Sequence, residues 1–89
     1  MDSIHAFYHR AKSNSRYDST ERNQILVCAT GHIWDVVIII DDEEVEFYLY
    51  ENKSDAIKAA RRLFNSIPKI KKLDVESRSE FKFKTIRTR

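Results

Sequence analysis

The stretch that most constrains the fold is residues 24–51, QILVCATGHIWDVVIIIDDEEVEFYLYE, where two apolar runs flank Gly31 and an acidic run follows them. Gly31 is the only glycine in the chain. Because glycine accepts a positive φ angle at the first position of a type II′ turn, Gly31 and His32 predict a two-residue hairpin turn. The acidic run 41–44 predicts a second turn. The stretch is therefore interpreted as three consecutive antiparallel strands.

The two turns predict which residues share a face of the sheet, because side chains alternate between faces along a strand. The predicted pairs are Thr30–Ile33, Ala29–Trp34, Val27–Val36 and Ile25–Ile38 across the first turn, and Ile40–Val45, Ile38–Phe47 and Val36–Leu49 across the second. One face is then apolar throughout, and it carries Ile25, Val27, Ala29, Trp34, Val36, Ile38, Ile40, Val45, Phe47 and Leu49.

The opposite face, called here the mixed face, carries both polar and apolar residues: Gln24, Leu26, Cys28, Thr30, Ile33, Asp35, Val37, Ile39, Glu46, Tyr48 and Tyr50. It is too apolar for an ordinary solvated surface. The N-terminal segment or a second copy of the chain could cover it, or it could be a working surface. The candidate protein-interface residues on it are Leu26, Ile33, Val37, Ile39, Tyr48 and Tyr50.

The remaining segments complete one small α+β domain of 89 residues. Residues 1–12 have the apolar spacing of a short helix, and the polar residues 13–23 predict a loop. Residues 54–66 predict an amphipathic helix with Ser54 as the N-cap and Pro68 just beyond its end. In the basic tail, residues 69–89, KIKKLDVE could form a short strand carrying Leu73 and Val75, and the alternation in 80–87 predicts a final strand with Phe81 and Phe83 facing the core. The expected core is a small antiparallel sheet, β-β-β-α-β, with the helix packed on its apolar face.

Composition restricts the compartment and the chemistry. A single cysteine excludes an internal disulfide and suits a reducing environment. The longest apolar run is far shorter than the roughly 20 residues that span a bilayer, and no signal-peptide pattern begins the sequence. We therefore expect a cytoplasmic protein. Net charge is −6 over residues 1–55 and +8 over residues 56–89, and such asymmetry favours polyanionic partners or a partner of opposite polarity.

No residue pattern predicts an enzyme or a bound cofactor. Cys28 lies mid-strand, and neither a glycine-rich turn nor an evident base accompanies it as nucleophilic catalysis requires. His5 and His9 share a helix face, but no second pair of ligands stands at metal-binding spacing, so no metal site is expected. The acidic run 41–44 lacks the alternating ligands and the glycine of a calcium loop.

The basic residues point instead to phosphate binding, which needs clustered Lys and Arg rather than a fixed motif. The candidate nucleic-acid-binding residues are Lys58, Arg61 and Arg62 on the helix, and Lys69, Lys71, Lys72, Lys82, Lys84 and Arg87 in the tail. Asp35 and Glu46 would repel phosphate from the mixed face, so binding is expected on the helix and tail. The leading hypothesis is a non-enzymatic nucleic-acid-binding protein that prefers RNA to DNA.

Three strands followed by a helix, with Trp34 in the second strand and SDAIKAARRL opening the helix, resemble small modules such as integrase arm-binding domains over about residues 33–66. Those modules read DNA through basic residues on the exposed sheet face, where this sequence has Asp35, Glu46 and Tyr48, so the DNA-reading function is not carried over. The small size is also similar to that of phage or mobile-element accessory proteins. The alternative hypothesis is accordingly an antitoxin-like or anti-defence inhibitor or adaptor, a homodimer in the host cytoplasm, which binds a protein such as a nuclease through the mixed face.

Overall fold

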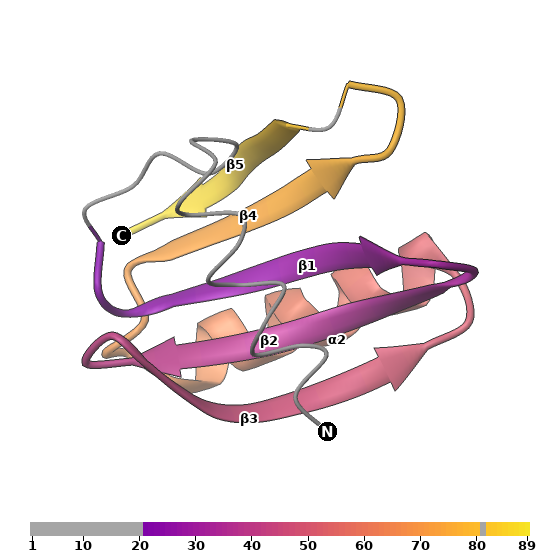
Figure 1. Cartoon of the computed structure of the whole chain (residues 1–89). Coiled ribbons are helices and arrows are strands. Elements are labelled where there is room, and N and C mark those ends of the chain that lie inside the picture. Colours follow the sequence, from indigo (N-terminus) through magenta and orange to yellow (C-terminus); the bar gives the residue numbers. More distant parts are fainter. Residues whose placement is uncertain (1–20, 81) are drawn as a thin grey trace.

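The computed structural model describes residues 21–80 and 82–89, and the predicted helix 1–12, most of the predicted loop 13–23 and Phe81 lie outside them. The described elements are β1 (Gln24–Thr30), β2 (Ile33–Ile40), β3 (Glu43–Tyr50), α2 (Lys53–Ser66), β4 (Lys72–Ser77) and β5 (Lys82–Thr88). The α+β class is confirmed, with α2 packed behind a five-stranded sheet (Figure 1).

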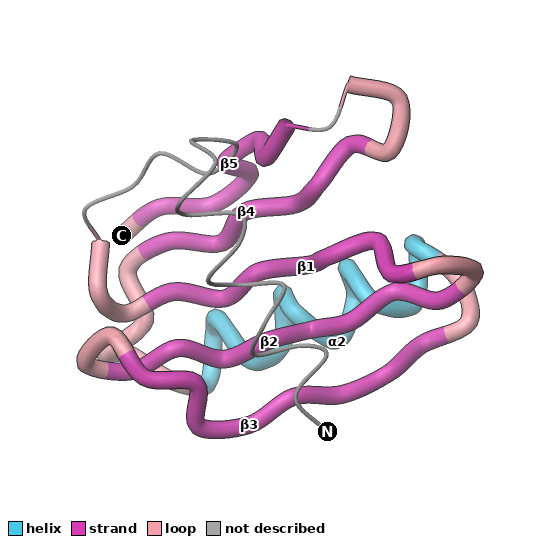
Figure 2. Tube along the Cα trace, in the orientation of Figure 1, coloured by secondary structure: helices cyan, strands magenta, loops and turns pink. Residues whose placement is uncertain are grey.

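The sheet is mixed rather than purely antiparallel. Its strand order is β3-β2-β1-β4-β5, and β4 runs parallel to β1 while all other neighbours are antiparallel. The chain leaves the sheet at β3, crosses behind it in α2 and returns on the far side of β1 (Figure 2). A strand that returns by way of a helix enters parallel to its new neighbour. The tail thus supplies two strands, β4 inside the sheet and β5 at its edge, where the sequence predicted the second and left the first open.

The predicted first hairpin is confirmed in turn and register. Gly31 has a φ of +60°, and no side chain lies within 4 Å of the position a Cβ would occupy. Thr30 pairs with Ile33 and Val27 with Val36. A left-handed backbone at the first turn position is what selects glycine here, since a β-carbon would strain it.

The predicted register of the second hairpin is wrong by two residues at the turn, where Ile40 was expected opposite Val45, and by one residue beyond a bulge. Ile40 pairs with Glu43 across a two-residue turn, and a bulge then leaves Ile38 opposite Glu46 instead of Phe47. Both turn residues, Asp41 and Asp42, have positive φ angles of 55° and 68°, as a type I′ turn requires. A register shift of one residue moves each side chain of the strand to the other face of the sheet. Tyr48 and Tyr50 therefore lie on the helix side of the sheet, and Phe47 and Leu49 lie on the opposite side.

Helix α2 begins one residue earlier than predicted, and its N-cap is Asn52 rather than Ser54. The Asn52 side-chain oxygen accepts a hydrogen bond from Asp55 N at 2.9 Å. Asp55 adds a negative charge in the first turn, where the helix dipole favours it. The helix ends at Ser66, two residues before Pro68, as the sequence predicted.

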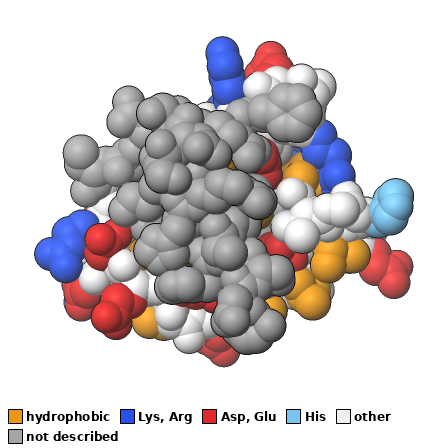
Figure 3. Space-filling view, in the orientation of Figure 1, with side chains coloured by type: hydrophobic (Ala, Val, Ile, Leu, Met, Phe, Trp, Pro, Cys, Tyr) orange, Lys and Arg blue, Asp and Glu red, His pale blue; other side chains and the backbone are white. Residues whose placement is uncertain are grey.

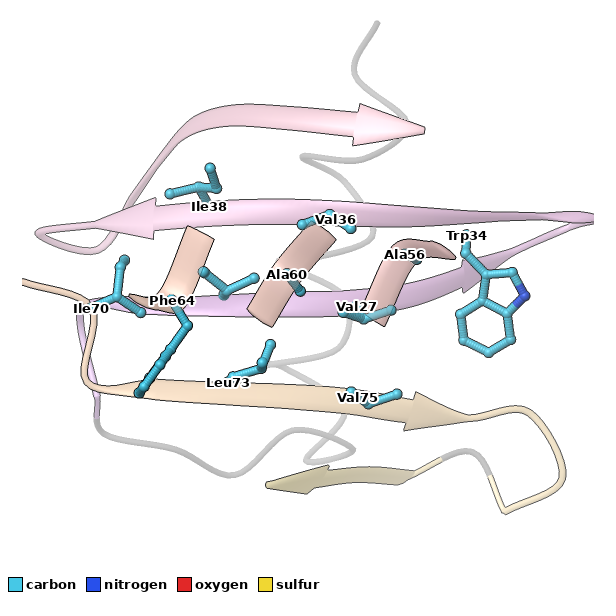
Figure 4. Close-up of a cluster of buried hydrophobic side chains, with 11 residues drawn as sticks. Val27, Trp34, Val36, Ile38, Ala56, Ala60, Phe64, Ile70, Leu73 and Val75 are labelled. Carbon is cyan, nitrogen blue, oxygen red and sulfur yellow. The ribbon is translucent and has the colours of Figure 1, made fainter. Parts of the chain in front are cut away.

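The main core lies between α2 and the helix side of the sheet (Figure 4). Ala56, Ala60 and Phe64 form the buried face of the helix, and the two alanines let the helix approach the strands closely. The sheet contributes Ile25, Val27, Trp34, Val36, Ile38, Leu73 and Val75, and Ile70 closes one end. Among the described residues no helix has the length and apolar character needed to cross a membrane.

A second buried cluster lies on the other side of the sheet and consists of Leu26, Cys28, Val37 and Ile39, with Phe83 packed against it. Three carboxyl side chains are buried on the same side. Thr85 donates to Asp74 at 2.6 Å, Ala29 N donates to Glu76 at 2.8 Å, and Thr30 donates to Asp35 at 2.6 Å. Burial raises the pKa of Asp35, and the Thr30 hydroxyl opposes that rise by bonding the carboxylate. The mixed character read from the sequence of β1 and β2 therefore corresponds to a second, partly polar core.

Candidate nucleic-acid interface

A groove of about 190 Å³ runs between α2 and strands β4 and β5. Its apolar lining comes from Ile57 on the helix and from Val75 and Ile86 on the strands. Lys53 and Arg61 border it from the helix and Lys84 from β5. The arrangement follows from local geometry, since Ile57 and Arg61 are one turn apart on α2 and Lys84 lies opposite Val75 on the same face of the sheet.

The remaining groove residues are Ser77 and Glu76. The Glu76 carboxylate accepts a hydrogen bond from Ala29 N at 2.8 Å, on the opposite side of the sheet from the helix. The groove therefore combines two cations of α2 and one of β5 with one carboxylate, which is bonded to Ala29 N. Three cationic side chains above an apolar lining can hold an anion that carries a flat or apolar portion.

Trp34 fixes the position of one of these cations. The Lys53 ammonium lies 5.2 Å from the centre of the Trp34 ring, and the Arg78 guanidinium lies 4.8 Å from it. Arg78 also donates to the carbonyl oxygens of Gly31 and Ile33, so its charge is engaged in the β1–β2 turn. Cation–π contacts of this kind orient the long side chain of Lys53 at the end of the groove.

Phe64 anchors the C-terminal end of β5 to the helix through two arginines. The guanidinium groups of Arg87 and Arg89 lie 5.1 Å and 4.1 Å from its ring centre. Arg89 also donates to the carbonyl oxygens of Phe64 at 2.7 Å and Ile67 at 3.2 Å, and to that of Ile70. Carbonyls at the end of a helix have no partner within it, and a guanidinium with several donors satisfies them.

The structure brings part of the predicted basic set together. Arg61 and Lys84 share the groove, and Arg87 lies on Phe64 at the same helix–strand seam. Lys58, Arg62 and Lys82 are exposed on α2 and β5 around it. The predicted residues of the loop before β4 and of its start lie elsewhere: Lys69 pairs with Asp41 at 3.0 Å, Lys72 lies 3.6 Å from Asp74, and Lys71 is exposed between them.

The structure divides the predicted protein-interface set. Leu26, Val37 and Ile39 are fully buried, and Ile33 is half-buried. The corrected register places Tyr48 and Tyr50 on the other side of the sheet, where Tyr50 packs against the main core and Tyr48 is exposed. These six residues consequently do not form one surface patch.

The candidates for catalysis and metal binding are dispersed. Cys28 is buried, whereas His32 is exposed in the first turn. Within residues 21–80 and 82–89 no three His, Cys, Asp or Glu side chains come together in a metal-binding cluster. His5 and His9 lie outside the described residues.

Sequence reasoning missed Lys53 as a groove residue and did not foresee that Arg78 and Arg89 have structural roles. Lys53 was treated as part of the loop before the helix, since Ser54 was taken as the N-cap. The Asn52-x-x-Asp55 spacing was the available signal, because Asn is among the best N-caps and an acid in the first turn reinforces it. Nothing in the sequence indicated that Arg78 would reach Trp34, which lies 44 positions away.

Comparison of the chain with protein-family models, with curated proteins and with solved structures finds no match. A function can therefore be inferred only from the geometry and charge of the groove.

Proposed function

We propose that this protein binds single-stranded nucleic acid, RNA in preference to DNA, along the seam between α2 and β5. The observation that carries the proposal is the groove in which Lys53, Arg61 and Lys84 surround the apolar side chains of Ile57 and Ile86. Cations spaced along a groove contact successive phosphates, and this electrostatic term dominates affinity for nucleic acids.

The apolar lining favours unpaired bases over a duplex. A duplex presents phosphates on its outside and keeps its bases stacked, so it would use the cations and leave Ile57 and Ile86 uncovered. An unpaired base has an apolar face that can pack on aliphatic or aromatic side chains. RNA is the expected form, because proteins that recognise RNA sequences mostly bind single-stranded loops and ends.

The first test is a salt titration of binding to a labelled single-stranded RNA, a single-stranded DNA of matching sequence and a DNA duplex. Each phosphate contact contributes about −0.7 to the log–log salt slope for a single strand. The four seam cations, Lys53, Arg61, Lys84 and Arg87, should give a slope of about −3 for RNA. Duplex DNA should bind more weakly at every salt concentration. Binding absent at moderate salt, or a preference for the duplex, would contradict the proposal.

The double variant Arg61→Glu/Lys84→Glu should reduce RNA affinity at least about tenfold, since it reverses two groove charges. The matched control is Lys69→Glu/Lys71→Glu, which makes the same change in net charge near the Asp41 turn. The control should keep most of the affinity. Equal losses in the two variants would mean that RNA responds to overall charge and not to the groove.

A further inference from the structure

Strands β3 and β5 form the two edges of the sheet, and in the described part of the chain each is paired on one side alone. β3 exposes large apolar side chains, with exposed fractions of 54% for Val45, 38% for Phe47, 37% for Tyr48 and 55% for Leu49. Hydrophobic and acidic side chains lie beside one another along the lower margin of the space-filling view (Figure 3), where β3 runs in the same orientation (Figure 1). An apolar edge with open backbone groups is a template for the addition of another strand.

The two edges carry opposite charges. The acidic residues of the β3 edge and its turn are Asp41, Asp42, Glu43, Glu44 and Glu46, and the basic residues of the β5 edge are Lys82, Lys84 and Arg87. Two β3 edges therefore repel each other, and so do two β5 edges. A β3 edge and a β5 edge attract, because charge complementarity selects partners and sets their register.

The strand directions fit this pairing. β3 runs parallel to β1, whereas β5 runs antiparallel to it. A second copy placed beside the first in the same orientation thus brings its β3 antiparallel to the β5 of the first, with both helices on the same side.

The side chains match in that arrangement as well. Phe47 lies on the side of the sheet away from α2, as does Phe83, while Glu46 and Lys84 lie on the helix side. In an antiparallel pair, the register that places Phe47 opposite Phe83 also places Glu46 opposite Lys84. Aromatic pairs and opposite charges are the cross-strand contacts that stabilise sheets most.

We propose that a second copy of this chain adds its β3 edge to the β5 edge of the first, so that one continuous sheet runs through successive copies. The contact is head to tail, and it leaves one free edge of each kind at the ends of the assembly. A single strand pair with flanking side chains makes a small interface, so the association is weak and depends on concentration.

The test is sedimentation of the full chain, freed of nucleic acid, over a wide range of protein and salt concentrations. The mean mass should rise with concentration past that of a dimer, and added salt should lower it by screening the edge charges. A constant monomer mass overturns the proposal. A mass that stops at the dimer also overturns it, because a head-to-tail contact does not close at two copies.

Charge exchange tests the register. Glu46→Lys and Lys84→Glu should each weaken association about tenfold, since attraction across the strands becomes repulsion. The double variant Glu46→Lys/Lys84→Glu should restore it. The control Lys58→Glu makes the same charge change as Lys84→Glu at an exposed position on α2, away from both edge strands, and should leave association unchanged. If Glu46→Lys strengthens association and Lys84→Glu has no effect, β3 pairs with β3 and the proposal is wrong.

Discussion

The two edge strands differ in the kind of contact that holds them to the rest of the molecule. β5 is fastened to α2 and the core by Ile86, which packs against the main core, and by Arg87 and Arg89, which stack on Phe64. β3 is held in another way, since it pairs with β2 along its whole length and Tyr50 is the side chain by which it packs against the main core.

This difference shows where a rigid binding surface can form. Cations on β5 and α2 stand on a seam with packed side chains beneath them, so Lys84 and Arg61 keep a defined spacing. The apolar residues of β3 stand on an edge strand that is held mainly by its backbone pairing with β2. A strand backed by helix side chains suits a site that must match successive phosphates, whereas exposed apolar side chains on an edge strand suit the addition of another strand, which aligns itself through the backbone.

Removing the anchor of β5 should produce the largest effect. Arg89→Ala leaves the carbonyls of Phe64 and Ile67 without their guanidinium partner and removes the stacking on Phe64. We expect the free energy of unfolding to fall by about 2 kcal/mol. Chemical denaturation measures this change. The control is Arg62→Ala, which truncates an exposed arginine on α2 and should change the free energy of unfolding by less than about 0.5 kcal/mol. An equal loss in the two variants would show that Arg89 has no special role.

Matched truncations on the two edges should sharpen the contrast. Ile86→Ala removes a half-buried side chain packed against the main core, so we expect a loss of about 1.5 kcal/mol. Leu49→Ala removes a side chain that is 55% exposed, and the loss should be below about 0.5 kcal/mol. Thermal unfolding of the two variants at low protein concentration makes the comparison. Equal losses would contradict the view that side-chain packing on the core holds β5 more than it holds β3.

An interior strand carries a carboxyl group whose ionisation should make stability depend on pH. Burial raises the pKa of Asp35 on β2, so folding favours its protonated form, and ionisation lowers stability as pH rises through the raised pKa. Asp35→Asn should therefore stabilise the protein by about 1 kcal/mol at neutral pH. The gain in stability should vanish below pH 3.8, the ordinary pKa of an aspartate, because the carboxyl is then protonated in both folded and unfolded chains. Denaturation across this pH range measures it, and a gain that is independent of pH would rule out the ionisation of Asp35 as its cause.

The smallest expected effect concerns the turn that leads into β3. Asp42 has a φ of 68°, which glycine adopts without strain, and Asp-Gly is a preferred type I′ pair. Asp42→Gly should raise stability by about 0.5 kcal/mol, measured by thermal unfolding. Glu43→Gly, one residue later inside the strand, should instead lower it. A Glu43→Gly variant more stable than the Asp42→Gly variant would contradict the type I′ assignment.

The sequence by itself determined the first hairpin, the helix and the apolar character of the core. Gly31 allowed one tight turn, and alternation then selected the face on which Val27 and Val36 lie. Pro68 set the end of the helix, and the spacing of Ala56, Ala60 and Phe64 set its buried side. These features depend on local geometry, which a short stretch of residues encodes completely.

Tertiary structure decided the register of β3, the place of β4 and the membership of the site. The acidic turn was compatible with a loop of two or four residues. β3 is also an edge strand with exposed side chains on both faces, so burial does not select one register for it. Leu73 and Val75 alternate with acids, so the sequence allowed a short strand there, but its place beside β1 came from the helix that returns the chain to the sheet. Arg61 and Lys84 come from distant segments, as do Lys53 and Trp34, and long-range packing alone brings the first two to one groove and the Lys53 ammonium over the Trp34 ring.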